Sequence, residues 1–303
     1  MGRRLMRQRI NGARRLRELM GSRDIIVAPG AYDALSARLV EAAGFEVVYI
    51  TGFGTAASML GYPDAGLITM TEMVDNVRRI VDAVNIPVIA DADTGYGNPI
   101  NVIRTVQAYE DAGAAGIHIE DQVWPKKCGH MARKELIPVE DMVEKIRAAV
   151  DARRNKDFLI IARTDAIAVE GIERAFERAW EYYRAGADVL FIEGPENVEQ
   201  IEAIAREFKG VPLLFNWAGF GTKTPPVDLE TLRRLGYKIV IIPIALLLAA
   251  TKAMKEVLNI IKRDGTPINA RELMADFKEF TDFIGWPEIY ELEDKYRSRA
   301  KSG

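Results

Sequence analysis

The sequence predicts an α/β protein that folds as a (β/α)8 barrel of the TIM type. Eight short apolar runs recur along the chain, and each is followed by a longer stretch with helical periodicity. The runs are nearly continuous in Val, Ile, Leu and Ala, which is typical of parallel strands buried on both faces. Eight strand–helix units within about 240 residues match the size of such a barrel. An open, doubly wound sheet is the alternative that the same alternation allows.

The predicted elements alternate in chain order. The strands are expected at residues 25–28, 47–51, 87–93, 116–122, 158–165, 189–194, 212–218 and 238–244. The helices are expected at residues 33–43, 71–84, 98–112, 138–153, 171–185, 197–208, 229–235 and 245–264. Several helices should stop at a glycine, because Gly readily adopts the left-handed conformation there; these are Gly44, Gly113, Gly186 and Gly236.

The barrel is expected at residues 24–264, between two smaller segments. Residues 1–23 carry eight arginines and one acid, Glu18, and should form a basic helix or arm. An organelle transit peptide, a nucleic-acid arm or a contact with anionic membrane would fit the same composition. We expect instead a solvated helix that touches the barrel through Leu5, Ile10, Leu16 and Leu19. Residues 265–303 should form a C-terminal tail with helices at 270–284 and 288–297.

Composition excludes several classes of protein. The net charge of −3 disfavours a globally basic nucleic-acid binder. The longest apolar run, 239–251, is shorter than the roughly 20 residues that a membrane span needs. The single cysteine, Cys128, excludes an internal disulfide framework and a multi-cysteine zinc site. We therefore expect a cytoplasmic protein that binds neither membrane nor nucleic acid.

Polar residues gather where the predicted strands end. Chemistry in barrel enzymes occurs at this face, and unpaired buried charges cost several kcal/mol each, so their concentration indicates a function. Asp91 and Asp93 share one strand face, and Glu120 comes from the neighbouring strand. Three carboxylates without a His or Cys pattern suit Mg²⁺ or Mn²⁺. Helix caps and structural ion pairs are the alternative for each of them, and Asp121 and Asp165 fit such supporting roles better.

A polar loop after the fourth predicted strand carries Lys126, Lys127, Cys128, Gly129 and His130 in succession. The neighbouring positive charges predict a lowered pKa for the thiol, so that it could donate and regain a proton near neutrality. A nucleophilic role and an unreactive free cysteine are the alternatives. The glycine permits a close backbone approach or a hinge. The other histidine, His118, lies inside the fourth predicted strand and is interpreted as a structural residue of the barrel.

Four motifs together resemble the isocitrate lyase/phosphoenolpyruvate mutase superfamily, over about residues 14–296. They are Asp91-Ala92-Asp93-Thr94-Gly95-Tyr96-Gly97-Asn98, Glu120-Asp121-Gln122, Lys126-Lys127-Cys128-Gly129-His130 and Ala162-Arg163-Thr164-Asp165. The cysteine motif is typical of the short carbon–carbon lyases of this superfamily, whereas its phosphonate mutases and hydrolases generally lack that cysteine.

The resemblance implies a barrel with a C-terminal helix swapped between subunits, in dimers that pair into a homotetramer. It implies Mg²⁺ held through Asp91 and Asp93, with Glu120 close by. In the implied catalytic set Cys128 protonates the departing carbanion, and the other members are Arg163, Tyr49, His130 and Lys127. The implied substrate-binding residues are Thr51, Gly52, Phe53, Asp64, Gly129, Glu193 and Asn216.

The implied function is a Mg²⁺-dependent lyase that cleaves a 2-hydroxy di- or tricarboxylate, of the methylisocitrate or alkylmalate type. The products would be a 2-oxo acid such as pyruvate and a second carboxylate. The chain departs from methylisocitrate lyases at Phe53, at Ala218-Gly219 and in the apolar segment 243–248, where those enzymes place a glycine, polar residues and an arginine. These departures favour a dicarboxylate with alkyl groups. A phosphonate mutase, an oxaloacetate hydrolase or decarboxylase, and a catalytically silent barrel are the alternatives, and the base is left open between Tyr49 and a metal-bound water.

Overall fold

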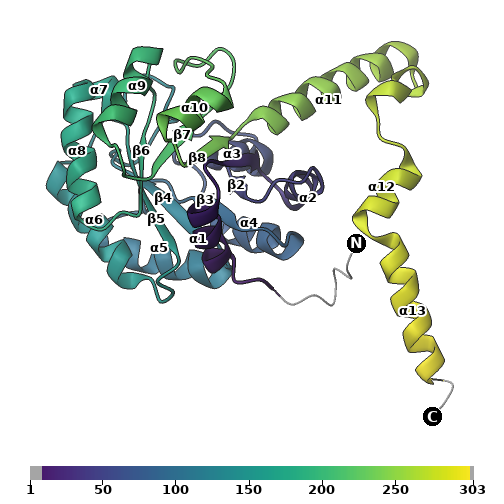
Figure 1. Ribbon diagram of the computed structural model, residues 1–303. Helices are drawn as coiled ribbons and strands as arrows, with labels where there is room; N and C mark the ends of the chain where they lie inside the picture. The colour runs from purple at the N-terminus through teal and green to yellow at the C-terminus, as the bar shows by residue number, and fades with distance from the viewer. Residues whose placement is uncertain (1–8, 301–303) are drawn as a thin grey trace. The chain divides into compact units, whose positions relative to one another are not determined.

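The computed structural model describes residues 9–300, and its sheet is a closed barrel of eight parallel strands in chain order (Figure 1). The strands are β1 (Ile26–Ala31), β2 (Val48–Ile50), β3 (Val88–Asp91), β4 (Gly116–Glu120), β5 (Leu159–Thr164), β6 (Val189–Ile192), β7 (Leu213–Asn216) and β8 (Ile239–Ile242). The barrel closes where β1 pairs with β8, with Val27 opposite Val240. The predicted (β/α)8 barrel is confirmed, and the open sheet is wrong.

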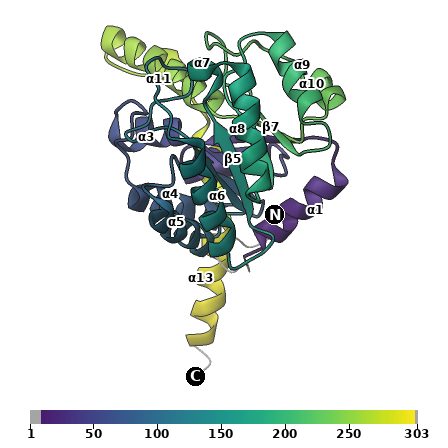
Figure 2. The ribbon, with the colours of Figure 1, turned by 90° about the vertical axis from the view of Figure 1, so that its left-hand side faces the viewer.

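Helices form a ring outside the strands (Figures 1 and 2). The helices of the barrel and its N-terminus are α1 (Gly12–Ser22), α2 (Ala34–Ala42), α3 (Gly52–Leu60), α4 (Met70–Ala83), α5 (Pro99–Ala112), α6 (Val139–Ala152), α7 (Ile167–Glu170), α8 (Ile172–Arg184), α9 (Val198–Glu207) and α10 (Leu229–Leu235). Two of them, α3 and α7, were not predicted. Thr51 caps the first of these, because its side chain accepts from the backbone N–H of Gly54.

The apolar residues divide into two clusters according to the face of the strand that they occupy. One cluster lies between the strands and the helices, and the other fills the barrel interior, with Ile89, Leu159 and Phe191 among its members. Alternate strand residues point to opposite faces, so near-continuous apolar runs supply both clusters at once. This packing holds the ends of the strands, and therefore the polar residues that follow them, in fixed positions.

Helix α1 packs against the barrel through the predicted residues Leu16 and Leu19, which are buried in the interior cluster. Ile10 is exposed instead, and Leu5 lies outside the described residues. The Arg17 guanidinium lies 2.6 Å from an Asp188 carboxylate oxygen, so part of the basic segment forms structural ion pairs.

The chain divides into two compact units, with residues 10–247 in the barrel unit. The predicted barrel boundary lay at residue 264, at the end of the helix that the structure shows as α11 (Ala245–Asp264). The other unit contains most of α11, a 3-10 helix η1 (Ile268–Leu273), α12 (Phe277–Ile284) and α13 (Trp286–Ala300). None of the residues of α11, all of which the structure describes, is buried.

An apolar cavity of about 300 Å³ lies on the outer face of β1 and β8, beside α10. Val27, Val240 and Ile242 line it from the strands, and Leu232 lines it from α10. A regular barrel covers this face with the helix that follows the eighth strand. Within the barrel unit of residues 10–247, these residues line a cavity.

Candidate active site

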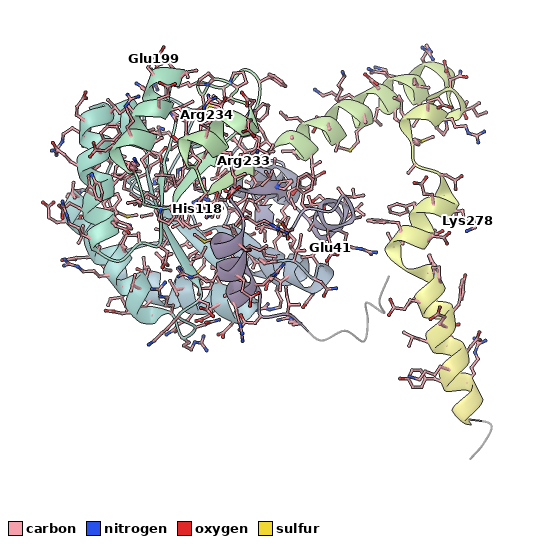
Figure 3. The ribbon with its side chains drawn as sticks, in the orientation of Figure 1. Glu41, His118, Glu199, Arg233, Arg234 and Lys278 are labelled. Carbon is pink, nitrogen blue, oxygen red and sulfur yellow. The ribbon has the colours of Figure 1, made fainter. Side chains whose placement is uncertain are left out.

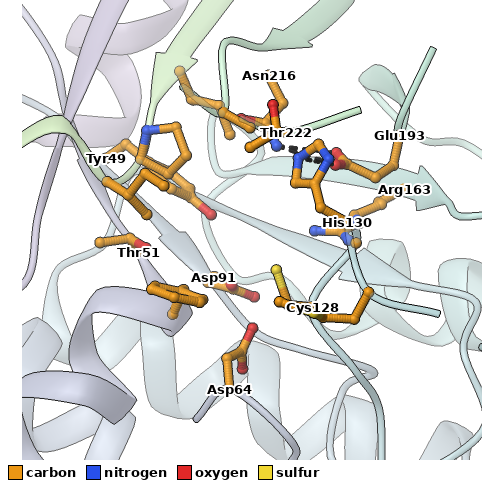
Figure 4. Close-up of a pocket in the computed structure, with 17 residues that line it drawn as sticks. Tyr49, Thr51, Asp64, Asp91, Cys128, His130, Arg163, Glu193, Asn216 and Thr222 are labelled. Atoms are coloured by element: carbon orange, nitrogen blue, oxygen red, sulfur yellow. Dashed lines mark hydrogen bonds and ion pairs between the residues drawn. The ribbon is translucent and has the colours of Figure 1, made fainter. Parts of the chain in front are cut away.

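A cavity of about 160 Å³ lies at the carboxyl ends of the strands, where barrel enzymes place their chemistry (Figure 4). Its lining combines one cysteine, several charged groups and an apolar wall. The lining residues are Tyr49, Thr51, Phe53, Asp64, Asp91, Cys128, Gly129, His130, Met131, Arg163, Glu193, Asn216, Ala218, Thr222, Ile241, Pro243 and Ile244. Of the predicted site residues, Gly52, Asp93, Glu120 and Lys127 are not part of this lining.

The carboxylate of Asp91 is fixed at the end of β3 by two backbone groups. One oxygen accepts from the N–H of Asp93 at 2.9 Å, and the other accepts from the N–H of Gly52 at 3.2 Å. A Cβ atom at Gly52 would lie 2.5 Å from that second oxygen, so only glycine permits this approach. The structure thus joins the ends of β2 and β3 through one acid.

The loop lysine that enters the site is Lys126. Its ammonium lies 2.6 Å from Asp64 Oδ1 and 2.9 Å from Asp93 Oδ1, and its side chain is almost fully buried. Burial alone would lower the pKa of Lys126, but the surrounding acids raise it well above its usual value. The ammonium of Lys127 instead donates to the carbonyl of Arg133, at the surface. Two adjacent lysines in a loop give no periodicity that could have distinguished them in the sequence.

Two buried carboxylates beside the cavity have oxygens that accept no hydrogen bond. They belong to Asp93 and Glu120, which form ion pairs with Lys126 and Arg163. Burial raises the pKa of Asp93 to about 7 and that of Glu120 well above its usual value. Within residues 9–300, no three acidic, His or Cys side chains form a ready-made metal site. Mg²⁺, however, is usually held by one or two carboxylates together with waters and substrate, so these residues fit it.

Cys128 faces the cavity from its loop, and its backbone N–H donates to the carbonyl of Asp64 at 3.2 Å. The predicted fall in the thiol pKa is wrong. Burial raises the pKa of Cys128 to about 11, and this outweighs the opposing effects of Lys126 and Arg163. The group is therefore a protonated thiol at neutral pH, which is the form that a proton donor requires.

Arg163 enters the cavity from β5 and is paired on its other side with two acids. Its Nε lies 2.9 Å from Asp165 Oδ2 and 3.2 Å from Glu120 Oε2. Burial alone would raise the pKa of Asp165, yet Arg163 and Lys134 hold it well below its usual value. The supporting role predicted for Asp165 is therefore to fix the Arg163 guanidinium in position.

Glu193 and Asn216 close the side of the cavity near β6 and β7. The Asn216 amide donates to both Glu193 carboxylate oxygens at 3.2 Å, and the Glu193 Oε1 atom lies 3.1 Å from His130 Nε2. A Cβ atom at Gly129 would lie 2.6 Å from the Arg163 guanidinium and 2.7 Å from Glu193 Oε1. The glycine of the motif therefore lets the loop backbone lie directly on these two side chains.

Tyr49 lines the cavity from β2, and its hydroxyl lies 2.8 Å from the Nε2 atom of His118. Figure 3 shows His118 inside the barrel, whereas the labelled Glu199 and Arg233 lie at its outside. Burial raises the pKa of Tyr49 well above its usual value and lowers that of His118 to about 4. Tyr49 therefore stays protonated at neutral pH, which suits a hydrogen-bond donor rather than a base. Sequence reasoning took His118 as structural only and had no signal for this contact.

Apolar side chains also line the cavity. They include Phe53 from α3, Ala218 after β7, and Pro243 and Ile244 after β8. Phe53 and Ala218 are positions at which the sequence is expected to depart from methylisocitrate lyases. Pro243 and Ile244 lie in the apolar segment 243–248, where a further departure is expected. The predicted departures therefore line the same cavity as the acids and Arg163.

A family model described as phosphoenolpyruvate phosphomutase matches residues 16–262. The chain is 48% identical over 287 residues to the 2,3-dimethylmalate lyase of Eubacterium barkeri, covering 95% of this chain and 99% of that protein. It is 49% identical over 284 residues to a 2-methylisocitrate lyase of Aeropyrum pernix, covering 94% of this chain and 90% of that protein.

Solved structures give the same grouping. A crystal structure of 2,3-dimethylmalate lyase superposes with a TM-score of 0.87 at 39% identity, covering 98% of this chain and 97% of that one. A structure of oxaloacetate acetylhydrolase bound to 3,3-difluorooxalacetate superposes with a TM-score of 0.81 at 39% identity, covering 87% of this chain and 93% of that one. The chain therefore belongs to the phosphoenolpyruvate mutase/isocitrate lyase superfamily, and it is a carbon–carbon lyase of that superfamily.

Proposed function

We propose that this enzyme cleaves a 2-hydroxy dicarboxylate of the alkylmalate type into a 2-oxo acid and a second carboxylate. The single observation behind it is a cavity lining that combines charged groups with apolar side chains. The lining presents Arg163, Asp91 and the protonated thiol of Cys128, together with the apolar side chains of Phe53 and Ile244. A third carboxylate directed at these apolar side chains would have no partner, and a buried unpaired carboxylate is costly.

The charged groups of the lining suit recognition of the 2-hydroxy acid end of the substrate. Asp91, Asp93 and Glu120 would hold Mg²⁺, which would supply Lewis-acid polarisation of the substrate's 2-oxygen. The start of α3, where the N–H groups of Gly52 and Gly54 already donate to Asp91 and Thr51, would direct the positive end of the helix dipole toward a substrate carboxylate. Arg163 adds a fixed positive charge that Asp165 and Glu120 orient.

The reaction is a retro-Claisen cleavage in which the substrate's own carboxylate accepts the electrons. The 2-hydroxyl passes its proton to a water molecule, the C2–C3 bond breaks, and the electron pair of that bond moves onto C3 and into the adjacent carboxylate. The C2 end leaves as the 2-oxo acid. The Sγ–H bond of Cys128 then breaks as its proton joins C3, and the thiolate regains a proton from solvent. The hydroxyl of Tyr49 donates a hydrogen bond in this scheme, because its raised pKa keeps it protonated.

We further propose a cytoplasmic homotetramer built from helix-swapped dimers. The apolar cavity on β1 and β8 and the apolar residues of α11, none of which is buried, support this arrangement, because a helix from a second copy could fill such a cavity. No helix within the described chain is both long enough and apolar enough to cross a membrane. The proposal places the substrate site within one barrel, since all its lining residues lie in the unit of residues 10–247.

The experiment that tests the proposed substrate class is a panel of 2-hydroxy and 2-oxo acids incubated with enzyme and Mg²⁺. Alkylmalates, methylisocitrate, isocitrate, oxaloacetate and phosphonopyruvate are compared by release of the 2-oxo acid or of acetate or phosphate. We expect the highest kcat/KM with an alkylmalate. The Ile244→Arg variant should then lose alkylmalate activity and gain in relative preference for the tricarboxylates. Preferred hydrolysis of oxaloacetate, the reaction of one structural relative, would contradict the proposal.

A further inference from the structure

Lys134 is a buried lysine that bridges two parts of the site. Its ammonium donates to the backbone carbonyl of Gly129 at 2.5 Å and to Asp165 Oδ1 at 2.7 Å. The Lys134 side chain is 2% exposed and the Asp165 side chain is fully buried. Burying a charge costs several kcal/mol unless the charge is paired and hydrogen-bonded. The Lys134 ammonium is both.

The carboxylate that receives Lys134 also fixes Arg163. Asp165 Oδ2 lies 2.9 Å from Arg163 Nε, and Oδ1 lies 3.2 Å from Nη2. The backbone of Asp165 is itself held, because its N–H donates to Asp121 Oδ1 at 3.0 Å. Asp121 is anchored in turn by the hydroxyl of Tyr182 from α8, at 2.8 Å. One rigid carboxylate on the barrel therefore contacts both a cavity-facing cation and the loop lysine.

The other end of the bridge lies beside the thiol. Gly129 directly follows Cys128, so the carbonyl that accepts from Lys134 belongs to the peptide segment that carries the proton donor. The turn that brings Lys134 back into the site includes Arg133, whose φ of 61° lies in the left-handed region. Non-glycine residues occupy this region at a cost, and they persist where surrounding contacts hold them.

We propose that Lys134 and Asp165 are positioning residues that clamp the Cys128–Gly129 segment against Arg163. Through one carboxylate they set the distance between the proton donor and the guanidinium that faces the substrate. The clamp stands on the contacts above, and only its consequence for turnover rests on the proposed lyase function. Neither side chain lines the cavity, so both act through the residues that do.

The clamp is tested without substrate by the alkylation rate of Cys128, which is the only cysteine of the chain. We expect iodoacetamide at pH 8.5 to react roughly 10- to 100-fold faster with Lys134→Met, the change in loop opening expected on losing one or two charge-assisted hydrogen bonds. Asp165→Asn should raise the rate similarly. Adding both substitutions should raise it little further, because they remove the same bridge.

The matched control is Lys145→Met, which removes another buried lysine that donates to a backbone carbonyl, that of Thr94 at 3.2 Å. This variant should alkylate at the wild-type rate, and circular dichroism should show that all variants are folded. If Lys134→Met does not fold, Asp165→Asn alone carries the test. A wild-type alkylation rate in the folded variants, or an equal rise in the control, overturns the clamp.

Measurements of kcat and KM distinguish a failure of the clamp from a failure of the proposed reaction. On the substrate found by the panel, Lys134→Met should lower kcat far more than it raises KM, and Lys134→Arg should restore part of the loss because it keeps the charge and the donors. If alkylation accelerates while kcat stays unchanged, the coupling of Cys128 to the reaction is refuted. If no panel compound is cleaved, the proposed function fails while the alkylation result still decides the clamp.

Discussion

The substitution Cys128→Ser removes the proton donor while retaining a hydroxyl of similar size. The pKa of the thiol is about 11, some four units above neutral pH, so nearly every enzyme molecule holds the proton ready. A serine hydroxyl gives up its proton far less readily. The other candidate donors are already engaged, since Lys126 pairs with Asp64 and Asp93 and His130 lies against Glu193.

The expected loss of turnover is large because no other proton donor replaces the thiol. General acid–base groups contribute roughly 10²–10⁴-fold to turnover. We expect Cys128→Ser to fall in the upper half of that range, about 10³–10⁴-fold, which corresponds to about 4–5 kcal/mol in the activation free energy. Binding of substrate and cation should remain near wild type, because the thiol has no role in either.

The assay combines steady-state turnover with rapid-quench single turnover on the preferred substrate. Bond cleavage precedes proton donation, so the variant should form the 2-oxo acid transiently yet fail to release the second carboxylate. Met131→Leu, a conservative change at the neighbouring lining position, provides the control and should remain active. Turnover of Cys128→Ser within about threefold of wild type would refute the role of the thiol, because general acid groups contribute far more than that.

Three further predictions follow from the same structure. EDTA should abolish turnover and Mg²⁺ or Mn²⁺ should restore it, with Asp91→Ala losing more than Asp93→Ala; full activity in chelator would exclude the cation. Sedimentation at micromolar concentration should show an oligomer, because apolar side chains line a cavity on β1 and β8 and no residue of α11 is buried; a 34 kDa monomer would contradict this. The alkylation rate of Cys128 in the folded protein should keep rising between pH 9 and 11, because burial raises the thiol pKa and the reactive thiolate forms only there; a plateau at pH 8 would show that the lysines dominate.

The fold could be predicted because its determinants are local. Each strand–helix unit is recognised by an apolar run long enough for one buried strand, followed by a helical stretch and often by a glycine. Eight such units close a barrel. The short helix α3 was missed because Thr51 and Gly52 occupy both the end of a strand and a helix start. The division after residue 247 lies within α11, where no glycine or proline marks it in the sequence.

The sequence predicts which residues gather at the site better than it predicts their pKa values. Eleven of the predicted residues line the cavity, because strand ends and the cysteine motif fix where they lie. The thiol pKa was wrong because sequence proximity to lysines says nothing about burial, which dominates here. Lys126, His118 and Lys134 owe their roles to contacts across the barrel, at separations along the chain that no local pattern records.

The most direct test of carbon–carbon cleavage with protonation at C3 is a product balance by NMR in D₂O. With the preferred alkylmalate and Mg²⁺, we expect equal amounts of a 2-oxo acid and a second carboxylate. The second carboxylate should carry one deuteron at the carbon that was C3, and the 2-oxo acid should carry none from the cleavage step. Unequal products, or a second carboxylate without deuterium at that carbon, would contradict cleavage with protonation at C3.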